Sequence, residues 1–189
     1  QNNITISKTL NVTNTVVLDL NGFTLTNQLG NATTDVIVVA EGGELTINGE
    51  GTVAAVTGND GYTVISEGLL IINGGTYKGC ADGFAEGGCS VIYASSGNVI
   101  DIYGGTFQAL TADKTSYANK TEGVYAALNV ADNNGMINVY GGTFVKQNPA
   151  APGTEPAAWN AAHPNGFVAE GFIAVENNNE WNVIACDTE

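Results

Sequence analysis

One short signature recurs five times along the chain and constrains the fold more than any other feature. Each copy has two aliphatic residues separated by a variable one, followed by asparagine or tyrosine and then glycine. The copies are Leu18-Asp-Leu-Asn-Gly22, Leu45-Thr-Ile-Asn-Gly49, Leu70-Ile-Ile-Asn-Gly74, Ile100-Asp-Ile-Tyr-Gly104 and Ile137-Asn-Val-Tyr-Gly141. In the last three copies, the final glycine begins a Gly-Gly-Thr-Tyr or Gly-Gly-Thr-Phe turn. Such internal repetition indicates stacked copies of one structural unit.

The spacing and alternation of the signature predict an all-β fold, a right-handed parallel β-helix (solenoid) of about five coils. The threonines that follow the glycines are about 24 to about 37 residues apart, which is a solenoid-like period. The aliphatic residues of each copy alternate and therefore share one face, which forms the core. A second strand in each coil is expected to form a second sheet. These strands are Val36-Ile-Val-Val39, Tyr62-Thr-Val-Ile65, Ser90-Val-Ile-Tyr93 and Val124-Tyr-Ala-Ala-Leu128.

Equivalent residues of stacked coils form columns, because neighbouring parallel strands lie ~4.8 Å apart. We expect Asn21, Asn48 and Asn73 to align at the turn, where their amides can hydrogen-bond to one another. Tyr103 and Tyr140 continue that column. An apolar column is expected inside the core, made of Leu25, Val53, Tyr77, Phe107 and Phe144.

The chain divides into a β-helix over residues 1–166 and a C-terminal capping hairpin over residues 167–189. Three loop excursions, at 78–89, 108–122 and 145–165, follow the aromatic column and gather on one side, where binding residues normally lie. Two apolar runs flank Asn177-Asn-Asn179, which predicts the hairpin. Trp181 is large enough to cover the end of the core.

Charge excludes one class of partner. Nineteen acidic residues face five lysines, and the chain contains no arginine, for a net charge of −14. Without a basic patch, nucleic acid is not expected as a partner. No apolar run approaches the ~20 residues that span a bilayer, so membrane insertion is not expected either.

The cysteines leave two alternatives open. Cys80 and Cys89 bracket a glycine-rich stretch that a disulfide would clip, whereas a reduced state for all three cysteines, including Cys186, is equally compatible with the odd count. No CxxC pair is present and the chain has a single histidine, so neither zinc nor another cofactor is expected.

The repeats resemble those of a known family. The stretches that carry the resemblance are Leu18–Leu25, Leu45–Thr52, the three Gly-Gly-Thr-Tyr/Phe turns and Phe167-Val-Ala-Glu-Gly-Phe172. Together they resemble the pectin-lyase-like right-handed parallel β-helix family with Gly-Gly-Thr-Phe repeats. The resemblance implies a secreted or cell-surface protein of bacteria or a structural protein of their phages. The stretch Gly141-Gly-Thr-Phe-Val-Lys-Gln-Asn-Pro-Ala150 is most similar to the phage members.

The resemblance also suggests polysaccharide cleavage as an activity, but the residues of this chain do not favour it. Lyases of this kind use an arginine base, and the chain has none. Asp19 and Asp101 are expected in one column three coils apart, hence ~14 Å, beyond the ~6.5–9.5 Å of an inverting hydrolase. Glu41 and Glu67 are expected ~5 Å apart at a corner. We interpret them as acidic residues that solvate a turn, in preference to catalytic residues or ligands of a cation. The sequence therefore predicts no catalytic residues, with Glu41 and Glu67 as weak metal candidates.

These observations predict a non-enzymatic structural protein displayed outside a particle or cell, namely a phage head decoration or fibre component. Its partners would be other structural proteins of the same surface or further copies of the chain. The first alternative is a bacterial secreted or cell-surface adhesin that binds glycans through loop residues Tyr117 and Trp159. His163, in the same proline-rich loop as Trp159, is expected at the surface. A polysaccharide-cleaving enzyme is the second alternative.

Overall fold

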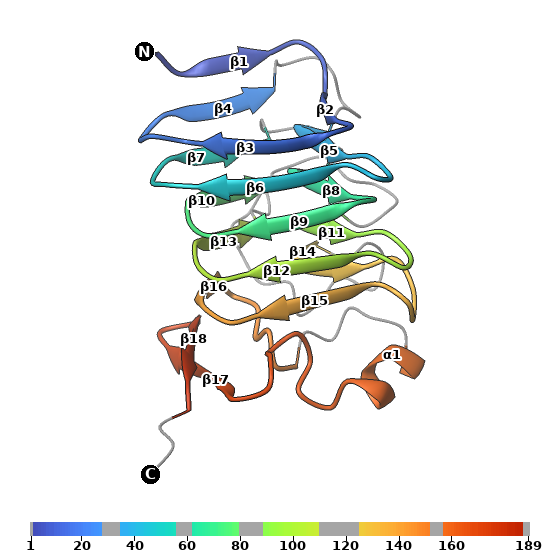
Figure 1. The fold of residues 1–189 in the computed structure, drawn as a ribbon. Coiled ribbons are helices and arrows are strands. Elements are labelled where there is room, and N and C mark those ends of the chain that lie inside the picture. Colours follow the sequence, from blue (N-terminus) through green and yellow to red (C-terminus); the bar gives the residue numbers. More distant parts are fainter. Residues whose placement is uncertain are drawn as a thin grey trace.

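A computed structural model describes residues 2–27, 35–55, 62–79, 89–109, 125–151 and 157–186. These residues form an all-β fold of three sheets whose strands are mostly parallel, as the repeats predicted (Figure 1). Each of five successive repeats contributes one strand to every sheet, in the order sheet A, sheet B, sheet C. Within the described part of the chain, no helix is long and apolar enough to cross a membrane.

Sheet A has eight strands and the other two have five each. In spatial order, sheet A contains β1 (Ile4–Ile6), β4 (Thr24–Asn27), β7 (Thr52–Ala54), β10 (Thr76–Gly79), β13 (Thr106–Ala109), β16 (Gly142–Val145), β18 (Glu180–Ala185) and β17 (Phe172–Asn177). Sheet B contains β2 (Leu10–Val12), β5 (Ile37–Val39), β8 (Val64–Ser66), β11 (Cys89–Ala94) and β14 (Tyr125–Val130). Sheet C contains β3 (Thr15–Asp19), β6 (Glu44–Asn48), β9 (Leu69–Ile72), β12 (Val99–Ile102) and β15 (Met136–Val139). Sheet B is the predicted second sheet, whereas the separate sheet A was not predicted.

The predicted apolar column is confirmed. Cα partners in sheet A run from Leu25 through Val53, Tyr77 and Phe107 to Phe144, and the last four side chains are completely buried. The aromatic rings stack with centroids 5.0 Å apart in both the Tyr77–Phe107 and the Phe107–Phe144 pairs. A parallel in-register ladder allows this stacking because each residue lies directly above its equivalent.

The predicted asparagine column is confirmed only in part. Asn73 Nδ2 donates to Asn48 Oδ1 over 2.7 Å, as expected. Asn21, however, is not in this column, because Asp19 is the Cα partner of Asn48. The corner after Asp19 spans residues 20–23, whereas the equivalent corner of the next repeat spans only 49–51. Asn21 therefore lies inside the longer corner, with a left-handed φ of 45° and its N–H bonded to Asp19 Oδ1.

The core is closed at its C-terminal end by a different device in each sheet. In sheet A, β18 pairs antiparallel with β16, and β17 follows as the predicted hairpin. In sheet B, the buried amide of Gln147 accepts from the N–H of Leu128 and donates to its carbonyl oxygen. In sheet C, Val168 bridges Val139. Trp181 is partly buried against the core, as expected of a cap.

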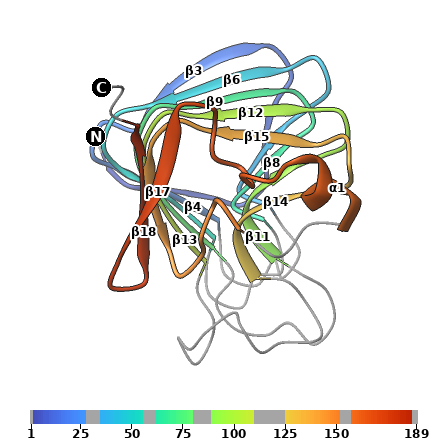
Figure 2. The same cartoon turned by 90° about the horizontal axis from the view of Figure 1, so that it is seen from below.

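A short helix contributes to the same cap, where the sequence predicted an irregular loop. α1 (Ala157–Ala162) is rich in alanine, the strongest helix former, and lies at the same end of the stack as the hairpin but on the opposite side (Figure 2). The prolines around it had favoured the loop prediction. Residues 80–88, 110–124 and 152–156, which belong to the three predicted excursions, lie outside the described residues.

The opposite end presents apolar residues of the first repeats. A hollow of about 550 Å³ there is lined mainly by apolar side chains of β1 to β4 and the corner after β3. Ile4 is 56% exposed at its rim, so the apolar core is covered more completely at its C-terminal end.

Candidate functional site

The corner between sheets B and C holds a groove that brings several carboxylates together. According to the registers of the flanking strands, this corner consists of residues 40–43 in the second repeat, 67–68 in the third and 95–98 in the fourth. A short corner is thus sandwiched between two longer ones. The groove follows from this difference in length, because the longer corners extend past the short one on both sides.

Both longer corners are β-turns of the same kind. Gly43 N donates to Ala40 O over 2.8 Å, and Asn98 N donates to Ser95 O over 3.3 Å. The third residue of each turn is a glycine with a left-handed φ, 76° at Gly42 and 75° at Gly97. Glycine adopts that conformation without the steric cost that other residues have.

The short corner is held close to its neighbours. Glu67 N donates to Val39 O, and Ser66 Oγ donates to Gly68 O. A Cβ atom on Gly68 would overlap the backbone oxygen of Gly43, so only glycine fits there. The groove between the corners has a volume of about 350 Å³. Its lining is acidic and glycine-rich and consists of Glu41, Gly42, Gly43, Glu44, Glu67, Gly68, Leu69, Gly97, Asn98 and Val99.

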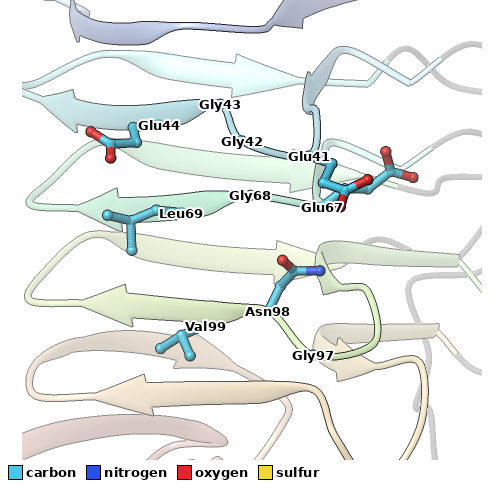
Figure 3. A pocket seen from close by; sticks show the side chains of 10 residues that line it. All are labelled: Glu41, Gly42, Gly43, Glu44, Glu67, Gly68, Leu69, Gly97, Asn98 and Val99. Carbon is cyan, nitrogen blue, oxygen red and sulfur yellow. The ribbon is translucent and has the colours of Figure 1, made fainter.

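Three exposed carboxylates line the groove. Figure 3 shows Glu41 and Glu67 at the sheet B end and Glu44 on β6 at the other. Glu44 Oε2 accepts a hydrogen bond from Thr15 Oγ1 over 3.0 Å. Glu41 and Glu67 thus line the same groove, as their position before the glycines had indicated. Among the described residues, no group of three or more His, Cys, Asp or Glu side chains is arranged to hold a metal ion, so the weak metal assignment to Glu41 and Glu67 gains no support.

A fourth carboxylate, that of Asp35, is affected by the negative charge of Glu67 at this corner. Its Oδ1 accepts from Tyr62 N over 2.7 Å. Burial raises the pKa of Asp35, and the negative charge of Glu67 raises it further. The ring of Tyr62 contacts that of Tyr93 at a tilt of 30° with centroids 4.6 Å apart, and burial raises the pKa of both phenols. This cluster could not be predicted from the repeats, because Asp35, Tyr62 and Tyr93 do not occupy equivalent positions in them.

The expected column containing both Asp19 and Asp101 is wrong. Asp19 pairs with Asn48, whereas Asp101 pairs with Ile71 and Asn138 in a different column. The error has the same origin as that of Asn21, because the first corner is longer than the sequence alignment assumed. Asp101 Oδ1 instead accepts from Asn138 Nδ2 over 2.9 Å. These two carboxylates therefore lie in different repeats and also at different positions along the strands of sheet C.

The asparagine column continues into two tyrosines, as predicted. The rings of Tyr103 and Tyr140 stack with centroids 4.8 Å apart and an interplanar angle of 9°. Tyr140 also contacts the edge of Phe172 from the hairpin, whereas Tyr103 is 52% exposed. Burial raises the pKa of Tyr140, and the nearby Asp101 contributes to the shift. The column thus places an exposed aromatic ring next to the hydrogen-bonded amides of Asn73 and Asn48.

The prediction that Trp159 is an exposed glycan-binding residue is wrong. Trp159 is 1% exposed, and its indole Nε1 donates to Gly135 O over 2.9 Å. Its ring stacks on His163, with centroids 4.1 Å apart, and contacts Phe167. Trp159 is therefore part of the cap, because α1 turns it toward the core, and His163 is half-buried beside it. Tyr117 lies outside the described residues.

The cysteine alternatives stay open in part. Cys80 and the side chain of Cys89 lie outside the described residues, so the disulfide between them is still a prediction. Cys186 is half-buried, and among the described residues its thiol forms no disulfide.

Gln147 is the structurally important residue that the sequence did not reveal. It directly follows Lys146, which has a left-handed φ of 62°, and this kink precedes the amide that closes sheet B. A glutamine after the last Gly-Gly-Thr-Phe was the only available signal, and glutamine is ordinarily a surface residue.

Comparisons with models of protein families, with curated proteins and with solved structures found no match for the chain. The resemblance to the pectin-lyase-like family is thus carried by the repeats alone.

Proposed function

We propose that this chain is a right-handed parallel β-helix that serves as a non-enzymatic structural protein on an extracellular surface, as a head decoration or fibre component of a phage particle. The observation that supports this role is the closure of the core at one end of the stack. A protein exposed outside a particle must resist unravelling from its ends, because fraying termini open at little free-energy cost.

The three closing devices suit such a role. The Gln147 amide satisfies backbone groups that would otherwise end sheet B unpaired, and the antiparallel β18 stops the parallel ladder of sheet A. Val168 bridges Val139 at the end of sheet C. Since all three act on the same end, that end can face solvent while the rest of the molecule contacts the particle.

The proposed partners are other structural proteins of the same particle. A net charge of −14 favours solubility and disfavours contact with nucleic acid, so the expected contacts are with protein.

Particles released from cells that carry the gene provide the test. After density-gradient purification, quantitative mass spectrometry should find peptides of this chain in a fixed ratio to the major shell protein. Immunogold labelling should place the chain on the particle exterior. Recovery of the chain only in the soluble or cell-wall fraction would contradict the proposal.

A second candidate function, glycan binding at a bacterial surface, is favoured by Tyr103. Its exposed ring could contact the apolar face of a sugar, while the neighbouring amides of Asn73 and Asn48 offer hydrogen bonds to hydroxyls. The assay is a glycan array with wild-type protein, Tyr103→Ala and the control Val17→Ala, which changes an exposed residue on β3 of sheet C. Binding that Tyr103→Ala abolishes and the control retains would support the adhesin, and an array without signal would count against it.

A further inference from the structure

Among the described residues, the hairpin that ends sheet A leaves one strand edge without a neighbouring strand, and only Phe172 N at its start is bonded elsewhere, to Ala169 O. β17 is the last strand of the sheet, and among the described strands its only partner is β18 (Figure 1). It has six residues, Phe172-Ile-Ala-Val-Glu-Asn177, with neither proline nor lysine. Long apolar edges without such residues readily pair with further strands.

The hydrogen bonds of the hairpin show which backbone groups face outward. Cys186 N donates to Gly171 O, so Gly171 belongs to a pair bonded toward β18. Backbone groups of an antiparallel strand point alternately to its two sides. Ile173 and Val175 therefore also bond toward β18, and the N–H and C=O groups of Ala174 and Glu176 point to the open edge.

The side chains of β17 alternate in the same way. Ile173 and Val175 are 46% and 42% exposed on one face of the hairpin, and Ile184, the Cα partner of Ile173, is 49% exposed beside them. We call these three residues the hairpin patch. Phe172 and Ala174 point to the opposite face, where they pack against the core. The exposed face therefore joins an apolar patch to an edge with unpaired backbone groups.

We propose that the β17 edge pairs with the β17 edge of a second copy of this chain, antiparallel about a two-fold axis at Ala174. In this register, Ala174 N–H donates to the carbonyl oxygen of Ala174 of the second copy, and the reverse bond forms as well. Glu176 N–H likewise donates to Phe172 O of the second copy. Sheet A of one copy continues into sheet A of the other.

The register is self-complementary in its side chains as well. Residues on the same face oppose one another in an antiparallel pair, so Ile173 lies opposite Val175 of the second copy on both sides of the axis. The two hairpin patches merge into one apolar surface that contains no charged side chain. A symmetric contact of this kind closes on itself and yields a dimer rather than a filament.

Charge opposes the contact from a distance. Each copy carries a net charge of −14, and the carboxylates of Glu176 and Glu180 lie at the hairpin turn. Salt screens this repulsion without weakening backbone or apolar contacts. Dimerisation should therefore strengthen as the salt concentration rises, which an assembly held by ion pairs would not do.

Analytical ultracentrifugation of the full chain provides the first test, over roughly 1 μM to 1 mM, where weak and moderate complexes dissociate. Wild type should shift from monomer to dimer with concentration. Ala174→Pro removes the central outward N–H but no bond to β18, and Ile173→Lys places a charge in the patch. Both should stay monomeric, while the control Val17→Lys, at an exposed site on β3, should dimerise like wild type. A wild type that is monomeric throughout, or dimers retained in both edge variants, would overturn the proposal.

Cross-linking tests the register. With Cys186 changed to serine, Ala174→Cys should form a disulfide between copies on mild oxidation, because paired Cα atoms of a hydrogen-bonded antiparallel pair are ~5.5 Å apart, within disulfide range. Val17→Cys should not cross-link. Peptide mass spectrometry should find residue 174 joined to residue 174, and a cross-link joining 174 to other cysteines instead would refute the register. The result is independent of the proposed particle location, since a dimer can form whether or not the chain occurs on phage.

Discussion

Gln147 bonds to Leu128 through both atoms of its side-chain amide, as a neighbouring strand would. Oε1 accepts from Leu128 N over 2.9 Å and Nε2 donates to Leu128 O over 3.2 Å. The side chain is 7% exposed, so water cannot easily replace it. One residue thus substitutes for the next strand of sheet B and lets the parallel stack end without orphaned backbone groups.

Gln147→Leu should accordingly destabilise the protein far more than an ordinary surface change. The substitution leaves the Leu128 N–H and C=O buried without partners, which costs about 2 to 5 kcal/mol in unfolding free energy. Urea denaturation gives the measurement. Gln108→Leu, on the outward face of β13, is the matched control and should change stability by less than ~0.5 kcal/mol. Equal effects of the two substitutions would show that the Gln147 amide does not close the sheet.

The aromatic ladder gives a second prediction. Phe107 is completely buried between the rings of Tyr77 and Phe144, so Phe107→Ala should lower the unfolding free energy by about 3 to 5 kcal/mol. Tyr103→Ala removes a ring with a similar stacking partner but 52% exposure, and should cost about 1 kcal/mol. Thermal or urea unfolding of both variants compares them directly. Similar losses would mean that stacking, rather than burial, dominates the ladder.

The sequence predicted the ladder because its evidence is local. Each Gly-Gly-Thr-aromatic turn marks the position of the next inward side chain, and side chains along a strand alternate between the two faces. Tyr77, Phe107 and Phe144 could therefore be aligned directly. The same reasoning failed at Asn21. An Asn-Gly pair occurs both at a strand end, as at Asn48, and inside a turn, and only the register of the neighbouring strand distinguishes the two.

The cap could not be predicted for a different reason. Trp159 bonds to Gly135 and Gln147 bonds to Leu128, contacts between segments about 20 residues apart whose meeting depends on how the last repeat ends. In sequence, a tryptophan in a proline-rich segment looks like an exposed binding residue. The groove at Glu41 and Glu67 shows an intermediate case: the glycines mark the corners, but the alternation of corner length appears only once the strands are in register.

The short corner leads to a third prediction. In Gly68→Ala, the new Cβ would overlap the backbone oxygen of Gly43 and come within 2.6 Å of that of Ala40. Backbone atoms inside a stacked corner cannot easily retreat, so the loss in unfolding free energy should be about 3 kcal/mol or more. Gly97→Ala is the control, since its Cβ would meet nothing within 4 Å and only its left-handed φ is unfavourable. It should cost about 1 to 2 kcal/mol. The comparison requires only urea unfolding, and the reverse order would contradict the proposed packing of the corners.

Asp35 gives the last prediction, which concerns pH. Burial, and secondarily Glu67, raise its pKa above that of the unfolded chain. The folded protein then holds the Asp35 proton more firmly than the unfolded chain does, so this contribution to stability is complete at low pH and is lost as pH rises through the raised pKa. Asp35→Asn retains an oxygen for Tyr62 N and never ionises. Its stability relative to wild type should therefore increase from below pH ~3.9, the ordinary value for aspartate, and level off above the raised pKa.

Urea unfolding across that pH range measures the difference, and carbon NMR titration of the Asp35 carboxyl follows the pKa itself. Glu67→Gln should lower the pKa of Asp35, because it removes a negative charge that favours the protonated carboxyl. Glu176→Gln, in the hairpin, should leave the Asp35 titration unchanged. A stability difference between Asp35→Asn and wild type that does not vary with pH would show that Asp35 titrates in the folded protein as it does in the unfolded chain. An Asp35 titration that is unchanged in Glu67→Gln would show that the charge of Glu67 does not affect it.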